Sequence, residues 1–347
     1  MGLNPPTQIE TVMHSTIPPR WNDDEIPSRA VVAEALRCPF PLRLNRHVQA
    51  AHEHALCWVK QTFGDELLAQ KAGRARMAWM VAGFYPSAGL VELSLAADYL
   101  CWAFALDDLG DETPIGERPS QLAELFRLFD GTFTGAPASI DEPVSVSALR
   151  DIVRRLRQLA SPEQVEAFRV GNQAYFGGML WEANNRAGKW VPHESSFLML
   201  RPAAGAVPPF FALVEPLEKL TLSAAVKAHP QVLELQRLAG GIVCWINDVL
   251  SFEKERALND VHNLAIVYEV HRALPPGAAL SQAVKLSNAE VDGFLARAAV
   301  LPRFSEDENA ALARYIDVLG SMIRITRDWT LGSARYAEHD ELARLAG

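Results

Sequence analysis

The chain has 347 residues, 49% of them hydrophobic and 22% charged, which is typical of a soluble globular protein with a sizeable core. Its 42 acidic and 33 basic residues give a formal net charge of −9, and the basic residues form no block. Nucleic acid and anionic membrane surfaces are therefore poor partners. A polyanionic ligand would need a metal ion to bridge it to this acidic protein.

The cysteines and the apolar runs indicate the compartment. Cys38, Cys57, Cys101 and Cys244 lie far apart without CxxC spacing, which argues against a zinc site and against a disulfide framework. The N-terminus has no basic flank followed by an apolar run, and the longest apolar runs are too short to span a bilayer. We therefore expect a cytoplasmic protein with no membrane insertion.

Seven prolines interrupt residues 1–45, which predicts an extended or irregular strap that lies over the rest of the protein. After this segment, apolar residues recur at three- and four-residue spacing, for example at Leu93, Ala97 and Leu100. The spacing predicts about ten helices with short connections and no strand. Because no shift in composition marks a second domain, we expect residues 46–347 to form a single all-α helical bundle.

The first acidic cluster lies in FALDDLGDE, residues 104–112, directly behind an apolar run. Asp107 and Asp111 are four residues apart, so on a helix they share one face, and Asp108 flanks them. Such carboxylates can bind a hard cation, and Mg²⁺ characteristically takes one or two of them together with waters and substrate phosphates. The alternative is a solvated helix C-terminus with Gly110 as its cap. An EF-hand is excluded because its required glycine and glutamate are out of place.

The second cluster lies in NDVLSFEKE, residues 247–255. Asn247, Ser251 and Glu255 follow i, i+4, i+8 spacing, so they line one stripe of a helix with an amide oxygen, a hydroxyl and a carboxylate. Oxygen donors of this kind suit a hard cation, and Lys254 beside them is placed to meet a phosphate. The alternative is a polar helix face with local Glu-Lys pairing, although Asn and Ser are mediocre helix formers.

With these residues in place, the chain resembles the bacterial class I terpene synthases. The DDxxD motif of that family is matched by Asp107, Asp108 and Asp111. Its second metal motif, NDxxSxxxE, is matched by Asn247, Asp248, Ser251 and Glu255. The resemblance covers residues 104–336 and extends to the proline-rich start. It implies the class I terpenoid synthase fold, with a central active-site cavity in a catalytic domain at 46–347.

Two further motifs of the family are present. Arg201 in LMLRPAAG matches the diphosphate-sensing arginine, and Gly205 matches the effector glycine. Arg335 and Tyr336 match the C-terminal Arg-Tyr pair. The position three after the sensor often carries an acid that links the sensor to a helix break, and here it is Ala204. This departure puts in doubt the coupling between the sensor and the helix break, but not the chemistry of ionisation.

We expect the helix that carries Arg201 to break at RPAAGAVPP. Pro208 and Pro209 cannot donate backbone hydrogen bonds, and Gly205 admits unusual dihedral angles. The break would leave free carbonyls, notably that of Gly205, facing the reacting cation.

The resemblance implies a lyase of isoprenoid biosynthesis that ionises a linear isoprenyl diphosphate, most simply the C15 farnesyl diphosphate, and cyclises the cation to a sesquiterpene. Three Mg²⁺ ions would bind together with the diphosphate, held by the two acidic motifs. Arg201, Lys254, Arg335 and the Tyr336 hydroxyl would donate to the phosphate oxygens.

A carbocation needs an apolar pocket with aromatic faces, since a desolvated cation-π contact is worth about 2 kcal/mol or more. The candidate substrate-binding residues are Phe84, Phe104, Trp181, Phe211, Trp245 and Trp329. Plain core packing is the alternative for each of them.

Three alternatives stay open at this point. The first is a diterpene or monoterpene cyclase of the same family. The second is a prenyl diphosphate synthase, although that class has a second aspartate-rich motif where this chain has the Asn-Ser-Glu pattern. The third is a non-catalytic helical binding protein. The sequence does not resolve the oligomeric state, and a homodimer is one possibility.

Overall fold

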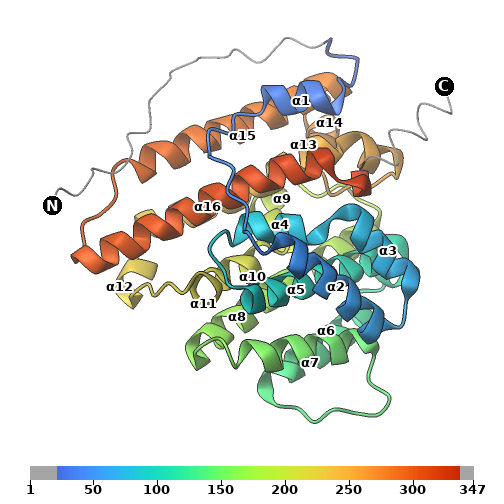
Figure 1. Ribbon diagram of the computed structural model, residues 1–347. Helices are drawn as coiled ribbons and strands as arrows, with labels where there is room; N and C mark the ends of the chain where they lie inside the picture. The colour runs from blue at the N-terminus through green and yellow to red at the C-terminus, as the bar shows by residue number, and fades with distance from the viewer. Residues whose placement is uncertain (1–21, 337–347) are drawn as a thin grey trace.

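The computed structural model describes residues 22–336, which form α-helices joined by loops, with no strand in this range (Figure 1). The all-α prediction is confirmed. In chain order the helices are α1 (Arg29–Ala35), α2 (Val48–Phe63), α3 (Glu66–Ala75), α4 (Met77–Phe84), α5 (Leu90–Glu112), the 3-10 helix η1 (Pro114–Glu117), α6 (Pro119–Thr134), α7 (Val144–Leu156), α8 (Pro162–Gly188), α9 (Glu194–Ala204), α10 (Val207–Ala212), α11 (Val214–Glu218), α12 (Ala224–Lys227), α13 (Pro230–Ala257), α14 (Leu264–His271), α15 (Pro276–Ala298) and α16 (Glu306–Gly332). The sequence predicted about ten helices because its periodicity does not separate short helices such as α10, α11 and α12 from their neighbours.

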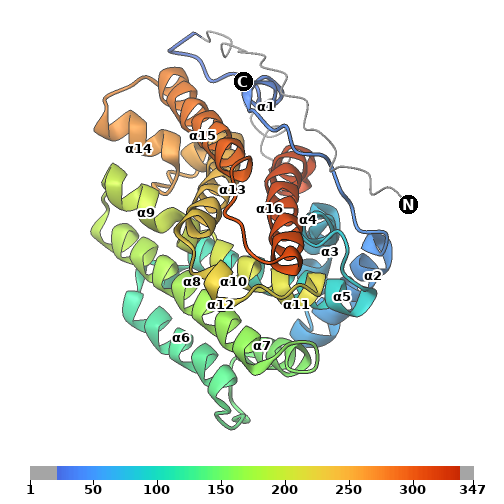
Figure 2. The same cartoon turned by 90° about the vertical axis from the view of Figure 1, so that its left-hand side faces the viewer.

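The described part of the predicted strap, residues 22–45, runs over α13, α15 and α16 (Figures 1 and 2). It contains the short helix α1, which begins after Pro27. Arg29 on α1 donates to the carbonyl oxygen of Leu250 at 3.1 Å and to that of Thr330, so it joins α13 to α16. Residues 1–21 lie outside the described residues, and a domain boundary at residue 45 stays a prediction.

Helix α13 packs against α15 and α16, α16 packs against α4, and α4 packs against α5 (Figure 2). Helix α8 packs against α9 and α10. Residues 92–103 of α5 are buried on all sides of the helix, and most of them are apolar, including Leu93, Tyr99 and Trp102. A helix with this pattern is stable only inside a protein. Long helices such as α16 begin at a defined residue, because Ser305 and Glu308 form a capping box at its start.

Within residues 22–336 no single helix is long and apolar enough to cross a membrane. One bent pair, Glu194–Ala204 followed by Val207–Glu218 at 46°, satisfies the length and composition of a broken span.

The predicted break after Arg201 is present between α9 and α10, but its geometry differs from the expectation. Gly205 has an ordinary φ of −77°, and Ala206 takes the left-handed conformation with φ of 57°. Pro202 lies inside α9, while Pro208 occupies the first turn of α10, where no backbone donor is needed. Gly205 is therefore not required for its backbone conformation.

Two glycines on α8 allow the chain around this break to lie directly on that helix. A Cβ atom on Gly171 would come within 2.8 Å of the Pro209 nitrogen. A Cβ on Gly178 would come within 2.8 Å of the Ala203 carbonyl carbon and closer still to Ala204. Because both neighbours are backbone atoms, which cannot rotate away, α8 fixes the position of the α9–α10 break.

The adjacent pair Gly177 and Gly178 gives a matched test of this packing. A Cβ on Gly177 would meet nothing within 4 Å. Gly177→Ala should therefore raise the free energy of unfolding by up to about 1 kcal/mol through helix propensity. Gly178→Ala should instead lower it by roughly 1–3 kcal/mol, because the methyl group overpacks against backbone. Urea denaturation of both variants measures the difference, and equal stabilities would contradict the proposed close contact.

Candidate active site

A cavity of about 750 Å³ lies between α4, α5, α8, α9, α10, α13 and α16, and the loop after α13 forms part of its wall. Its volume falls within the roughly 300–1,000 Å³ of small-molecule sites. The residues that line it include members of all four sequence motifs. The centre of the bundle thus holds an open site rather than a filled core.

The lining of the cavity changes from apolar to charged along three helices. On α5 the lining residues run from Leu100 through Phe104 to Asp107. On α16 they include Met322, and the segment after α16 adds Arg335. On α13 it contains, in chain order, Val243, Cys244, Asn247, Lys254 and Glu255. The segment after α16 joins the two charged clusters, because Arg335 pairs with Asp107 and the Tyr336 hydroxyl accepts from Asn247. The cavity therefore has one charged end and one apolar end.

Arg335 neutralises the aspartates at the end of α5. Its Nη2 lies 3.1 Å from Asp107 Oδ2 and 2.8 Å from Asp108 Oδ1, and its guanidinium carbon lies 4.4 Å from the centre of the Phe104 ring. Burial raises the pKa of Asp107, and the charge of Arg335 opposes this shift. The predicted ligand Asp111 has a backbone within α5, but its side chain lies outside the described part of the structure.

The predicted stripe on α13 is present, and each of its side chains has a partner. The Asn247 amide donates to the Tyr336 hydroxyl at 3.0 Å. The Ser251 hydroxyl donates to the Asn247 carbonyl at 2.8 Å, and this buried residue is not among those that line the cavity. Glu255 accepts from the Asn263 amide at 2.8 Å. Burial and neighbouring carboxylates raise the pKa of Glu255 to about 8.

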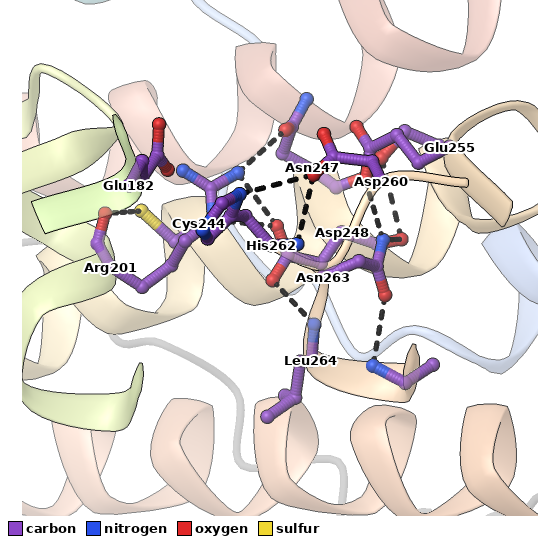
Figure 3. A network of polar contacts seen from close by, with 12 residues as sticks. Glu182, Arg201, Cys244, Asn247, Asp248, Glu255, Asp260, His262, Asn263 and Leu264 are labelled. Atoms are coloured by element: carbon purple, nitrogen blue, oxygen red, sulfur yellow. Dashed lines mark hydrogen bonds and ion pairs between the residues drawn. The ribbon is translucent and has the colours of Figure 1, made fainter. Parts of the chain in front are cut away.

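Arg201 is held by α13 rather than by its own helix (Figure 3). Its Nε and Nη2 donate to Asp248 Oδ1 at 3.0 and 2.7 Å, and Nη2 also lies 3.3 Å from Asn247 Oδ1. Asp248 is fully buried, and its second oxygen accepts from the backbone of Leu264 at 3.0 Å. A Cβ on Gly205 would lie 2.9 Å from Arg201 Nη1, so the glycine leaves room for the guanidinium.

The side chains present suit a hard cation only if a ligand completes the site. Within residues 22–336 no group of three or more His, Cys, Asp and Glu side chains could hold a metal ion without help from other donors. Mg²⁺, however, usually takes only one or two carboxylates and fills its shell with waters and substrate phosphates. Asp107 on α5 and the amide, hydroxyl and carboxylate on α13 are oxygen donors of the required type, so the donor set fits Mg²⁺.

Four of the six predicted aromatic residues line the cavity: Phe84, Phe104, Phe211 and Trp329. Trp181 and Trp245 are not among the residues that line it. Trp245 is buried on another side of α13, about 200° from Asn247, and donates to Glu290 at 2.6 Å. Trp181 packs against Phe197 and His262. Plain packing explains both tryptophans.

Sequence reasoning missed one polar wall of the cavity. This wall is lined by Glu182, Asn185 and Arg186 on α8 and by Lys189, the residue directly after that helix. Their i, i+3, i+4, i+7 spacing is a helical stripe that the sequence already contained. Other missed lining residues are Met80, Tyr175, Phe210, Asp260 and His262. Those on loops and short helices carry no periodic signal, so the sequence alone does not reveal them.

The fold and the site together define a class I terpenoid synthase. A solved structure of germacradien-4-ol synthase from Streptomyces citricolor has the same fold, with a TM-score of 0.76 and 24% identity over 85% of this chain and 97% of that chain. Residues 98–292, more than half of the chain, match terpene synthase family 2, C-terminal metal binding. The chain belongs to this family.

Curated relatives cover almost the whole chain. (+)-T-muurolol synthase of Roseiflexus castenholzii, described as cyclising (2E,6E)-farnesyl diphosphate, is 32% identical over 86% of this chain and 92% of its own length. Germacrene A synthase of Nostoc punctiforme is 29% identical over 90% of this chain and 97% of its own length. The prediction of a bacterial-type terpene synthase is confirmed.

The buried ion pair of Arg201 and Asp248 should be essential for stability. Arg201→Met leaves a buried carboxylate without its partner and should lower the free energy of unfolding by about 3 kcal/mol, measured by urea denaturation at pH 7. The double variant Arg201→Met/Asp248→Asn should be more stable than Arg201→Met, because no unpaired charge remains. Arg127→Met removes an exposed pair with Glu124 and should change little. A similarly small effect of Arg201→Met would contradict this interpretation.

Proposed function

We propose that the protein is a Mg²⁺-dependent cyclase of farnesyl diphosphate that forms a sesquiterpene hydrocarbon or alcohol and releases diphosphate. The observation that carries the proposal is the single cavity with a charged end and an apolar, aromatic end. A diphosphate fits the charged end and an isoprenyl chain fits the rest. The farnesyl substrate is supported by the name of the muurolol synthase relative.

The metal ions of this proposal would be held on two helices. Asp107, with Asp108 and Asp111 beside it, would serve from α5, and Asn247, Ser251 and Glu255 from α13. When bound, Mg²⁺ neutralises the diphosphate and stabilises it as a leaving group. We propose three ions, as the resemblance to the class I terpene synthases implies, bound together with the diphosphate at the charged end that both helices face.

The cationic side chains would assist departure of the diphosphate. The carbon–oxygen bond of the substrate breaks, and its electron pair leaves with the diphosphate. Arg201, Arg335 and Lys254 supply charge-assisted donors to that group, and Tyr336 supplies a hydroxyl. At an effective dielectric constant of about 20, each pair of unit charges 4 Å apart contributes roughly 4 kcal/mol. Arg335 would exchange its aspartate partners for a phosphate oxygen during this step.

The apolar end would then hold the carbocation. Phe84 and Phe211 lie on α4 and α10, while Phe104 and Trp329 are in contact with each other, with ring centres 5.7 Å apart. Their faces stabilise positive charge and keep water away from it. The carbonyl of Gly205, at the break between α9 and α10, is proposed to face the cation as it forms. Ring closure ends when the last cation loses a proton or captures water.

Product analysis tests the proposal directly. The protein is incubated with Mg²⁺ and, separately, with C10, C15 and C20 isoprenyl diphosphates, and the extracts are analysed by mass spectrometry. We expect a cyclic C15 product and free diphosphate, both abolished by a chelator. A cyclic product from the C10 or C20 substrate alone would show that the protein is a monoterpene or diterpene cyclase instead. An elongated prenyl diphosphate would indicate a prenyl diphosphate synthase, and no product from any substrate would support a binding protein.

Asp107→Asn should abolish turnover without unfolding the protein. The side chain is 38% exposed, so its loss should not disturb the core. Turnover should fall by roughly 100-fold or more, because groups that merely support metal ligands already cost about 10–100-fold. Asp130→Asn, which removes a charge from the pair with Arg169 between α6 and α8, is the matched control and should retain activity, because neither residue lines the cavity. Loss of the circular dichroism signal in Asp107→Asn would instead indicate a structural role.

A further inference from the structure

The residue that usually links the diphosphate sensor to the helix break is missing in this chain. Ala204 lines the cavity but carries no polar side-chain atom, so it cannot hold Arg201. The structure gives Arg201 a different anchor, the buried carboxylate of Asp248 on α13. The side-chain contacts of Arg201 therefore lead to α13 rather than to the break.

Asp248 is in turn bonded to the start of α14. Its carboxylate accepts from the Leu264 backbone at 3.0 Å, and its carbonyl oxygen accepts from the Asn263 side-chain amide at 2.7 Å. The same amide donates to Glu255 Oε2 at 2.8 Å. Asn263 thus reaches Glu255, which lies about two turns of α13 beyond Asp248 (Figure 3). Glu255 lines the cavity.

The side chain of Asn263 is held in the position from which it bonds Asp248 and Glu255. It is fully buried, and its Oδ1 accepts from the Ala265 backbone at 2.9 Å as the N-cap of α14. The cap fixes the side chain, so both protons of the amide point toward α13. A purely structural cap needs only the oxygen atom. The amide nitrogen, by contrast, is used entirely on Asp248 and Glu255.

We propose that Asn263 is a positioning residue that, through Asp248, couples the binding of diphosphate at Arg201 to the orientation of the Glu255 carboxylate. The proposal rests on the proposed function, in which Arg201 binds diphosphate and Glu255 holds Mg²⁺. Diphosphate binding at Arg201 then depends on the orientation of Glu255, which Asn263 holds. Such a chain is established only by measured coupling, which the experiment supplies.

The experiment titrates inorganic diphosphate into the full-length protein at saturating Mg²⁺, without isoprenyl substrate, by isothermal titration calorimetry. Asn263→Ser keeps an oxygen to cap α14 and removes the amide. It should weaken diphosphate binding by about 10–100-fold, the usual effect of losing a group that supports a metal ligand. Arg201→Lys keeps the charge and loses the bidentate geometry. The loss in the double variant should be smaller than the product of the two single losses.

Two results would overturn the coupling. The first is unchanged diphosphate affinity in Asn263→Ser, and the second is single losses that simply multiply in the double variant. Asn309→Ser makes the same exchange at an asparagine that bonds the Phe304 backbone at the start of α16, and it should bind diphosphate normally. If Asn263→Ser does not fold, Asn263→Thr, which also keeps a capping oxygen and fills more of the side-chain volume, should show the same loss. Failure of the unsubstituted protein to bind diphosphate would instead overturn the proposed function.

Discussion

Two arginines make the acidic end of this cavity possible. Carboxylates gathered in a partly buried site repel one another and lose hydration, so they need positive charge close by. Arg335 supplies it to Asp107 and Asp108 on α5, and Arg201 supplies it to Asp248 on α13. Each arginine comes from a different part of the chain than the acids it neutralises. The ion pairs therefore join α5, α9, α13 and the segment after α16 around one site.

The same two arginines explain how a charged site can be stable before any ligand arrives. Their guanidinium groups supply the positive charge that the carboxylates would otherwise need from a bound cation. A diphosphate bound with metal ions would bring both charges at once to the end of α5, negative for Arg335 and positive for Asp107 and Asp108. Arg335 can then exchange partners without leaving a buried charge alone, which is the costly alternative, while Arg201 keeps Asp248.

The sequence predicted those parts of the site that depend on helical spacing. Asn247 and Glu255 share a stripe of α13 because i, i+8 spacing on a helix leaves no other arrangement. The placement of aromatic residues was less predictable. Trp245 lies only two residues from Asn247, so helical spacing already turns it to another side of α13, where it packs against Glu290 and Phe197. For Trp181, the contacts with Phe197 and His262 decide its place, and these contacts depend on the tertiary fold. Long-range pairs such as Arg201 with Asp248 leave no local pattern in the sequence.

The break between α9 and α10 shows how a correct prediction can rest on the wrong residue. Proline and glycine signalled a break, yet Ala206 takes the strained left-handed conformation. Gly205 instead leaves space for the guanidinium of Arg201. An acid at position 204 would compete with Asp248 for the same five donors of that group. With Ala204 in place, the Nε and Nη2 atoms stay committed to α13, and the remaining edge beside Gly205 is left for a ligand oxygen.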